Sequence, residues 1–390
     1  MTLLFWIFFA LFFYAYFGYA LILYIITRFI PHKTKPQLPI DTNEYPQVTL
    51  FVTAYNELDI LQKKIDNCHA LDYPEDKLQI VFVTDGSNDG SDVFLSKIPG
   101  IIVHHSKQRK GKINAMNRGM AMVTTDIVVF TDANTELNTQ AIKEIAACFS
   151  NPKVGCVAGR KRVVSDTRSG AAAAGEGLYW RFESWLKKLD ARFFAPVGAV
   201  GELFSVRTAL FEPVPDNTIL DDMVISFNII QKGYLLTYEP KAIASETASF
   251  NMAEELKRKV RIAAGGWQTL FRSKKILNPF KYPRLAFQFF SHKVSRWTFA
   301  PWCFFLLLPV NVVIVLQNSS AAFWWLVLAF QVLFYTLAFF GKTGETSKRR
   351  VKLTFLPFYF VAINWATILG QVRYLKGSQP AAWDKAKRLQ

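Results

Sequence analysis

The sequence predicts an α/β domain with a mainly parallel sheet, Rossmann-like in its alternation, joined to membrane-spanning and interfacial helices. Two observations lead to this fold class. Between residues 47 and 131, short runs rich in Val, Ile, Phe and Thr alternate with helical segments, as in βαβ units. Long stretches without any charged side chain flank this region, at residues 2–27, 297–341 and 353–371.

The uncharged stretches are long enough to cross a bilayer, which takes about 20 apolar residues. We expect one span in the first stretch, two in the middle stretch, which divides at the polar residues 317–320, and one in the last. The first stretch is not a typical signal peptide, because no basic segment precedes it and its apolar run is too long.

The predicted organisation follows from these runs. It consists of a transmembrane helix at 1–30, a proline-punctuated linker at 31–46, an α/β domain at 47–273, an interfacial amphipathic region at 274–296, three transmembrane segments at 297–373 and a basic tail at 374–390.

The formal net charge of +16 suggests nucleic acid, anionic lipid or phosphate-bearing ligands as partners. The basic residues gather beside the spans, which favours a lipid bilayer and argues against nucleic acid. They are Arg28, His32, Lys33 and Lys35, then Lys274, Lys275, Lys281, Arg284, Lys293 and Arg296, then Lys342, Lys348, Arg349 and Arg350. The positive-inside rule places all three groups, and the α/β domain, on the cytoplasmic side.

The basic tail does not fit this topology. Four crossings place it outside, yet it carries Arg373, Lys376, Lys385, Lys387 and Arg388. Either the last segment is re-entrant or the tail breaks the rule. The four cysteines show neither disulfide nor zinc spacing, which fits a reduced cytosolic compartment.

Individual elements are predicted from periodicity. In the first half we expect strands at 47–53, 78–84, 101–105 and 127–131 and helices at 58–69, 90–97 and 112–123. The second half is less regular, with strands within 154–164, a loop at 170–177, an amphipathic helix at 175–189, a helix at 219–231, a strand at 234–239 and a basic helix at 253–271. Residues 282–296 suit a helix that lies on the lipid headgroups.

Acidic and amide side chains follow the predicted strands, at the sheet edge where open α/β folds bind ligands. Asp132 and Asn134 come directly after the strand 127–131, and a turn there can direct both side-chain oxygens at one Mg²⁺ or Mn²⁺ ion. The simpler interpretation is an Asx turn. Gly111 and Lys112 open a helix whose N-terminal amides suit an anion.

Other nucleotide-binding and hydrolytic classes are excluded by their missing motifs. The chain has no Gly-x-x-x-x-Gly-Lys-Ser/Thr sequence, no Gly-x-Gly-x-x-Gly after the first strand, and no Ser or Cys in a nucleophile elbow.

Four segments together resemble the motif series of family 2 glycosyltransferases, which have a GT-A fold. They are Thr53-Ala54-Tyr55-Asn56-Glu57, Thr84-Asp85-Gly86-Ser87-Asn88-Asp89-Gly90, Gly111-Lys112 with Ala115, Asn117 and Gly119, and Thr131-Asp132-Ala133-Asn134. The series covers residues 47 to about 270 in the family's order. The C-terminal spans are similar to those of the synthase branch, which contains cellulose, chitin, hyaluronan and poly-N-acetylglucosamine synthases.

The resemblance implies roles for residues at the nucleotide end of the site. Ala54, Tyr55 and Glu57 are expected to line the nucleoside pocket, and Asp85 to accept a hydrogen bond from the uracil ring. Lys112 is expected to help hold the donor.

The resemblance also implies a metal and a diphosphate clamp. Asp132 is expected to bind Mg²⁺ or Mn²⁺, with Asn134 at the position where the family has a second Asp. Residues 258–262 stand in the place of the family's Gln-x-x-Arg-Trp element, with Arg261 retained as the diphosphate clamp and Arg258 in the place of the Gln as a further donor-binding residue.

The acceptor side is implied in the same way. Glu202 lies in a segment, 198–204, that borders the acceptor site of the family, and Asp222 matches the catalytic base, with Asp221 beside it. The simpler interpretation of this acidic pair is a helix N-cap. Trp267 is expected to supply the aromatic wall that Ile262 does not.

These roles predict a membrane-bound inverting glycosyltransferase that moves a sugar, most simply from a UDP-sugar, to a growing β-linked glycan and passes that chain across the membrane. The expected place is a bacterial inner membrane with the catalytic domain in the cytoplasm. One alternative is transfer of a single sugar to a polyprenyl or glycolipid acceptor. Another is a non-catalytic membrane protein that binds nucleotide sugars, which the presence of Asp132, Asp222 and Arg261 disfavours.

Overall fold

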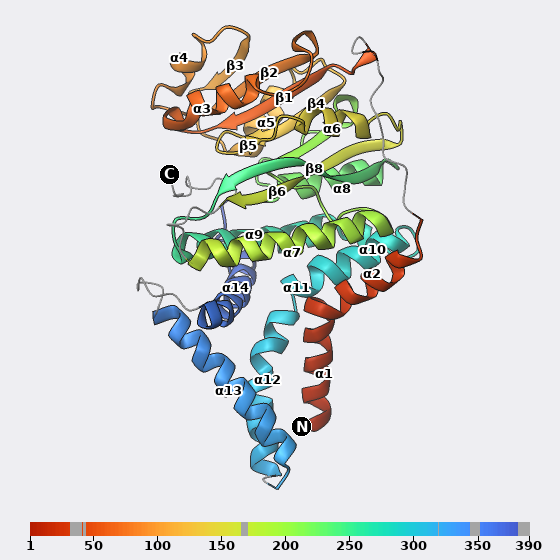
Figure 1. Cartoon of the computed structure of the whole chain (residues 1–390), viewed down its shortest axis with the longest axis vertical. Helices are drawn as coiled ribbons and strands as arrows, with labels where there is room; N and C mark the ends of the chain where they lie inside the picture. Colours follow the sequence, from red (N-terminus) through yellow and green to blue (C-terminus); the bar gives the residue numbers. More distant parts are fainter. Residues whose placement is uncertain (32–40, 42–43, 165–170, 319, 344–351, 381–390) are drawn as a thin grey trace.

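The computed structural model describes residues 1–31, 41, 44–164, 171–318, 320–343 and 352–380. A sheet-containing domain forms one end of the molecule, two long helices cross beneath it, and apolar helices extend from there to the other end (Figure 1). Most of the predicted linker 31–46, the basic residues 348–350 and the tail from residue 381 lie outside the described part of the chain.

Among the described residues, the sheet has eight strands in the order β3-β2-β1-β4-β7-β6-β8-β5. They are β1 (Val48–Ala54), β2 (Leu78–Asp85), β3 (Ile101–Ser106), β4 (Ile127–Asp132), β5 (Glu136–Leu137), β6 (Val154–Val164), β7 (Leu203–Arg207) and β8 (Leu235–Thr247). The first four are parallel, β7 is antiparallel to both β4 and β6, and β6 pairs with β8 in parallel. The prediction of a mainly parallel sheet is confirmed.

Helices cover both faces of this sheet, because successive strand residues point to opposite sides. Leu50 and Val52 of β1 pack in one core with α3 (Leu58–His69) and α6 (Ala141–Cys148). Phe51 packs in the other core with α5 (Lys112–Met120), α8 (Asp221–Gln231) and α10 (Pro283–Phe289). The remaining short helices are η3 (Glu75–Lys77), α4 (Ser91–Leu95), η4 (Thr208–Leu210) and η5 (Lys274–Leu277).

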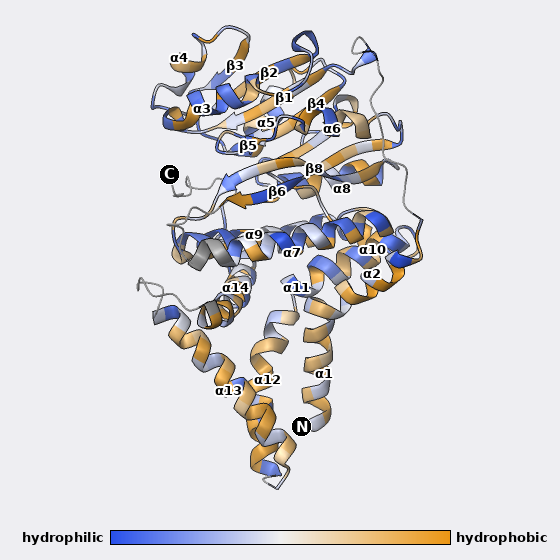
Figure 2. Ribbon diagram, in the orientation of Figure 1, coloured by the Kyte–Doolittle hydropathy of each residue, from blue (hydrophilic) through white to orange (hydrophobic). Residues whose placement is uncertain are grey.

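Within the described part of the chain, four helices are long and apolar enough to cross a membrane, as predicted from the uncharged runs. The first is a continuous helix over Thr2–Arg28, made of α1 (Thr2–Phe13), the π-helical turn η1 (Tyr14–Gly18) and α2 (Tyr19–Arg28). The others are α12 (Ala300–Gln317), α13 (Ala322–Thr343) and α14 (Lys352–Leu375). Figure 2 shows α1, α12 and α13 as the apolar end of the molecule.

The helix α14 packs along its length against the two long helices that lie beneath the sheet. Near its start, Phe355 and Tyr359 lie so close to Gly175 that a Cβ there would be 2.8 and 2.9 Å from their rings. Near its end, a Cβ on Gly370 would lie 2.5 Å from the Cβ of Ala263. These helices are α7 (Ala171–Phe193) and α9 (Met252–Arg272), and α14 also packs against α13.

Two predictions for the second half of the chain are wrong in part. The loop predicted at 170–177 is helical from Ala171, because alanine is the best helix former and Gly175 allows the close approach of α14. The helix predicted on the headgroups at 282–296 is divided into α10, a π-helical turn η6 (Phe290–Val294) and α11 (Ser295–Trp297). It buries Leu285 and Phe289 in the protein core rather than in lipid.

Candidate active site

A cavity of about 1760 Å³ opens where the parallel strands end and continues between the apolar helices. Twelve of the thirteen predicted site residues line it: Ala54, Tyr55, Glu57, Asp85, Lys112, Asp132, Asn134, Glu202, Asp221, Asp222, Arg258 and Arg261. The strand ends, the N-termini of α5 and α8, and one face of α9 thus converge on a single site, as expected for side chains at the carboxyl edge of a parallel sheet.

Lys112 lies at the centre of the polar part of this cavity. Its Nζ is 2.7 Å from Asp132 Oδ1 and 3.9 Å from Asp221 Oδ2, and it donates to the carbonyl of Gly201 over 3.3 Å. Burial opposes its positive charge, but the carboxylates of Asp132 and Asp221 outweigh burial and raise the pKa of Lys112 above its usual value. The site therefore holds the Lys112 ammonium between the carboxylates of Asp132 and Asp221.

Asp222 occupies the first turn of α8, beside Asp221. Burial, with the negative charges of Asp221 and Glu202, raises the pKa of Asp222 to about 7, while Lys112 and Lys187 act in the opposite direction. Gly201 leaves room in front of it, since a Cβ there would be 3.6 Å from Asp222 Oδ2. A carboxyl with a pKa near neutrality can exchange a proton with a substrate hydroxyl.

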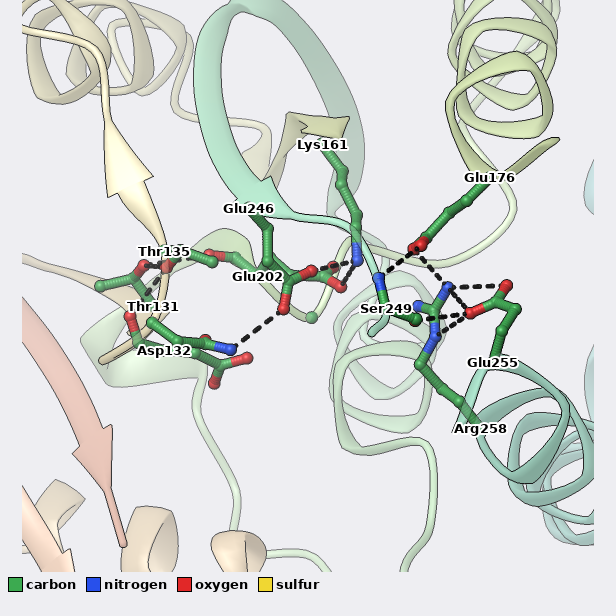
Figure 3. Close-up of polar contacts among 12 residues, drawn as sticks. Thr131, Asp132, Thr135, Lys161, Glu176, Glu202, Glu246, Ser249, Glu255 and Arg258 are labelled. Carbon is green, nitrogen blue, oxygen red and sulfur yellow. Dashed lines mark hydrogen bonds and ion pairs between the residues drawn. The ribbon is translucent and has the colours of Figure 1, made fainter. Parts of the chain in front are cut away.

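The two arginines of α9 differ in their surroundings. Arg261 donates to the carbonyl of Ile219 over 3.3 Å, and burial lowers its pKa against the opposing charges of Asp221 and Asp132. Arg258 instead forms ion pairs of 2.6 Å with Glu176 and 2.9 Å with Glu255 (Figure 3). Arg258 therefore ties α9 to α7 and holds two carboxylates in this structure.

The predicted nucleoside end is built around the loop before α5. Asp85 accepts hydrogen bonds from the backbone N–H groups of Lys110, at 3.1 Å, and Gly111, at 2.6 Å, so it fixes this loop. The guanidinium of Arg109 lies 4.0 Å from the centroid of the Tyr55 ring. Tyr55, Asp85 and Arg109 thus line the cavity together at the ends of β1 and β2.

The metal predicted at Asp132 and Asn134 would have few protein ligands. Among the described residues, no group of three or more His, Cys, Asp or Glu side chains could hold a metal ion. Asp132 offers a carboxylate on the cavity wall, while the amide nitrogen of Asn134 donates to Glu246 Oε1 over 3.1 Å. One carboxylate and an amide carbonyl fit an Mg²⁺ or Mn²⁺ ion that is bound mainly by substrate phosphates.

A buried ionic network behind Asn134 was not predicted. Lys161 of β6 is 2% exposed and bridges Glu202 and Glu246, at 2.5 Å from the Oε2 atom of Glu246. Figure 3 shows the Lys161 side chain directed at both carboxylates. Lys161 holds the pKa of Glu202 down, to about 2, against the effect of burial. No local sequence signal marks this lysine, since its partners lie 41 and 85 residues away.

A second buried network, also not predicted, connects α7 to η6. His292 Nδ1 is 2.7 Å from Asp190 Oδ2, and His292 Nε2 is 3.2 Å from Glu183 Oε1. The same Asp190 accepts from the hydroxyl of Tyr19 in the first apolar helix, over 2.5 Å. This network joins the N-terminal helix to α7 and η6.

Trp267 is the one predicted site residue that does not line the cavity. Its Nε1–H donates to the carbonyl of Trp297 over 2.7 Å, and its ring packs beside Phe271 and Tyr374. Trp267 follows Ile262 by little more than one helical turn, so the two side chains point to different sides of α9. Ile262 lines the cavity, and Trp267 does not. The aromatic residues that do line the cavity include Trp180 of α7 and Trp297 of α11.

Comparison with known proteins agrees with this geometry. Residues 49–211 match the model of glycosyl transferase family 2. The poly-beta-1,6-N-acetyl-D-glucosamine synthase of Staphylococcus aureus (strain MSSA476) is 28% identical over 263 residues, which cover 64% of this chain and 62% of the relative. The synthase of the same name from Staphylococcus epidermidis is 24% identical over 366 residues, 87% of each chain.

The matched part thus spans about 62% of the length of the Staphylococcus aureus relative. Among solved structures, the mannosyltransferase PcManGT from Pyrobaculum calidifontis, in complex with GDP-Man and Mn²⁺, has a TM-score of 0.68. It is 22% identical, and the alignment covers 95% of this chain and 99% of that one. This likeness shows that the two chains share the GT-A fold.

Proposed function

We propose that this chain is a membrane-bound inverting glycosyltransferase, because residues 49–211 match the model of glycosyl transferase family 2. It transfers a sugar from a nucleotide donor to a hydroxyl of a growing β-linked glycan. The observation that carries the proposal is the position of Asp222, a carboxyl with a pKa of about 7 on the same cavity wall as Lys112, Asp132 and Arg261.

The donor diphosphate is proposed to lie against Lys112, Asp132 and Arg261. Lys112 already neutralises the carboxylate of Asp132, and Arg261 adds a second fixed cation. Cations in a water-excluded site stabilise the charge that develops on a leaving diphosphate. An Mg²⁺ or Mn²⁺ ion, held by Asp132 and the amide oxygen of Asn134, would supply further charge neutralisation at the diphosphate.

Asp222 is proposed to remove the proton of the acceptor hydroxyl as that oxygen attacks the sugar. A single displacement of this kind inverts the configuration at the anomeric carbon and leaves the proton on Asp222. Asp221 Oδ2 is buried and accepts no hydrogen bond from the described residues, and Lys112 is 3.9 Å away. It is therefore suited to orient the acceptor hydroxyl beside the base.

Extension of a glycan is favoured over transfer of one sugar. The Staphylococcus epidermidis relative, named as a polymer synthase, matches 87% of this chain. The cavity continues from the polar site to the rings of Phe12, Phe304 and Phe360, on α1, α12 and α14. This continuous path supports the proposal that the spans pass the glycan across the membrane.

We further propose that only the first three apolar helices cross the bilayer and that α14 lies at its cytoplasmic face. Both halves of α14 contact the domain that holds the site, through Gly175 and Ala263. Its last turn also carries Arg373, which lines the site cavity. Three crossings place the basic tail on the same side as the other basic groups, so this topology agrees with the positive-inside rule.

The function is tested with purified full-length chain and a panel of labelled UDP- and GDP-sugars, with Mn²⁺, with Mg²⁺ and with EDTA. We expect one donor to be used, only in the presence of a divalent ion, with products that lengthen over time. A product that never exceeds one added sugar on extracted lipid would support the single-transfer alternative. Donor binding without any turnover would refute the enzyme assignment.

A further inference from the structure

We propose that Trp180 forms the aromatic wall of a subsite for the acceptor sugar, with Glu202 as its hydrogen-bonding partner. The ligand is a pyranose at the end of the acceptor glycan, which places its apolar C–H face on the indole and its hydroxyl groups against the carboxylate. This inference rests on the proposed glycosyl transfer and adds a residue on α7 to the site.

A chain of contacts leads from the base to the indole. Gly201 lies directly in front of Asp222, since a Cβ added to this glycine would lie 3.6 Å from the Oδ2 atom of Asp222. The next residue, Glu202, forms an ion pair with Lys161. The Nζ atom of Lys161 lies 4.9 Å from the centroid of the Trp180 ring. Trp180 and Glu202 therefore lie on the Asp222 side of the cavity, where the acceptor must arrive.

The chemistry of the two side chains fits a sugar. Trp180 and Glu202 both line the cavity, and 16% of the Glu202 side chain is exposed. Lys161 keeps Glu202 ionised and orients it, while a carboxylate has further lone pairs for ligand hydroxyls. An aromatic face with a few convergent polar groups is the usual composition of a ligand site.

The aromatic ring of Trp180 is the part of this side chain that a sugar would contact. Its Nε1–H is buried and has no hydrogen-bond partner among the described residues. Because this N–H is buried, contact with a ligand in the cavity falls to the carbon face of the indole, which lines the cavity.

The other tryptophan on the cavity wall is less suitable. Trp297 is only 9% exposed, and the backbone of α9 packs on it so closely that a Cβ on Gly266 would lie 2.5 Å from its ring. Its ring faces are thus occupied by protein. Trp267 lies outside the cavity wall. Trp180, which is half-buried in the first half of α7, is the indole on the cavity wall that remains for a sugar.

The test measures binding of a sugar probe without turnover. Full-length chain in lipid nanodiscs is titrated with a β-1,6-linked N-acetylglucosamine pentasaccharide, and separately with chitopentaose, without donor. We expect wild-type protein to bind at least one probe. Trp180→Ala should weaken binding by about tenfold or more, and Trp180→Phe, which keeps an aromatic face, by about threefold at most.

Trp185→Ala is the matched control, because Trp185 lies on the same helix, is 40% exposed and is not part of the cavity wall. It should bind the probes as wild type does. Binding of the donor nucleotide in the presence of Mn²⁺ is measured for each variant. This binding shows that the variant is folded, and it tests the donor site of the proposed function separately from the acceptor subsite. The inference is refuted if wild type binds neither probe, or if Trp180→Ala binds them as wild type does while it still binds nucleotide.

Discussion

Replacement of Asp222 by Asn should abolish the pH dependence of glycosyl transfer along with most of the rate. With a pKa of about 7 for the Asp222 carboxyl, Asp222 is ionised in ~9% of the enzyme molecules at pH 6 and in ~91% at pH 8. Only this form can accept the acceptor proton. The wild-type kcat/KM for the acceptor should therefore rise about tenfold between pH 6 and pH 8.

The assay follows release of the nucleotide diphosphate by full-length enzyme at a series of pH values, with donor and metal saturating. Asp222→Asn should lower the rate by ~10²–10⁴-fold, the usual contribution of a general base, and the residual rate should lack the inflection near pH 7. Donor affinity should change little, because Lys112 and Arg261 are intact. A wild-type inflection near pH 4, or an unchanged profile in Asp222→Asn, would refute this role of Asp222.

Three other outcomes follow from the contacts in the site. Because folding raises the pKa of Asp222 from 3.8 to about 7, wild type should lose stability as the pH rises through this window, so Asp222→Asn should raise Tm more at pH 8 than at pH 5. Lys161→Met removes the cation that pairs with buried Glu246 and partly buried Glu202 and should cost about 3–5 kcal/mol in denaturant unfolding, whereas Lys63→Met, at an exposed pair, should cost less than about 1 kcal/mol. Asn134→Asp places a carboxylate beside Glu246, so it should lower Tm without metal but reduce the Mn²⁺ concentration for half-maximal activity by about tenfold; an unchanged metal requirement would contradict the ligand role.

The sequence predicted the first half of the fold closely because its signals are local. Strands β1 to β4 and the helix α3 lie within one or two residues of their predicted bounds, since alternating apolar runs and polar strand ends mark them directly. The convergence of Asp132, Lys112 and Asp222 on one cavity also agrees with the prediction. Parallel strands bring their carboxyl ends to one edge, so strand-end residues become neighbours without further information.

The rest depended on pairings that local patterns do not contain. Lys161 and Glu246 are both side chains of strands, and their ion pair exists because β6 and β8 are adjacent in the sheet. Arg258 was predicted to bind the donor, but its contact with Glu176 exists because α7 lies beside α9 in the fold (Figure 1). The aromatic wall was assigned to Trp267 from sequence distance along α9, while the structure places Trp180 of a different helix on the cavity wall.

The most direct test of the central claim is the anomeric configuration of the product. Full-length enzyme is incubated with an α-configured, ¹³C-labelled nucleotide sugar and Mn²⁺, and the new linkage is read from its one-bond carbon–proton coupling by NMR. Single displacement with Asp222 as the base predicts a β-linked product from wild type and a loss of that product in Asp222→Asn. An α-linked product, or a β-linked product formed at the wild-type rate by Asp222→Asn, would contradict the account.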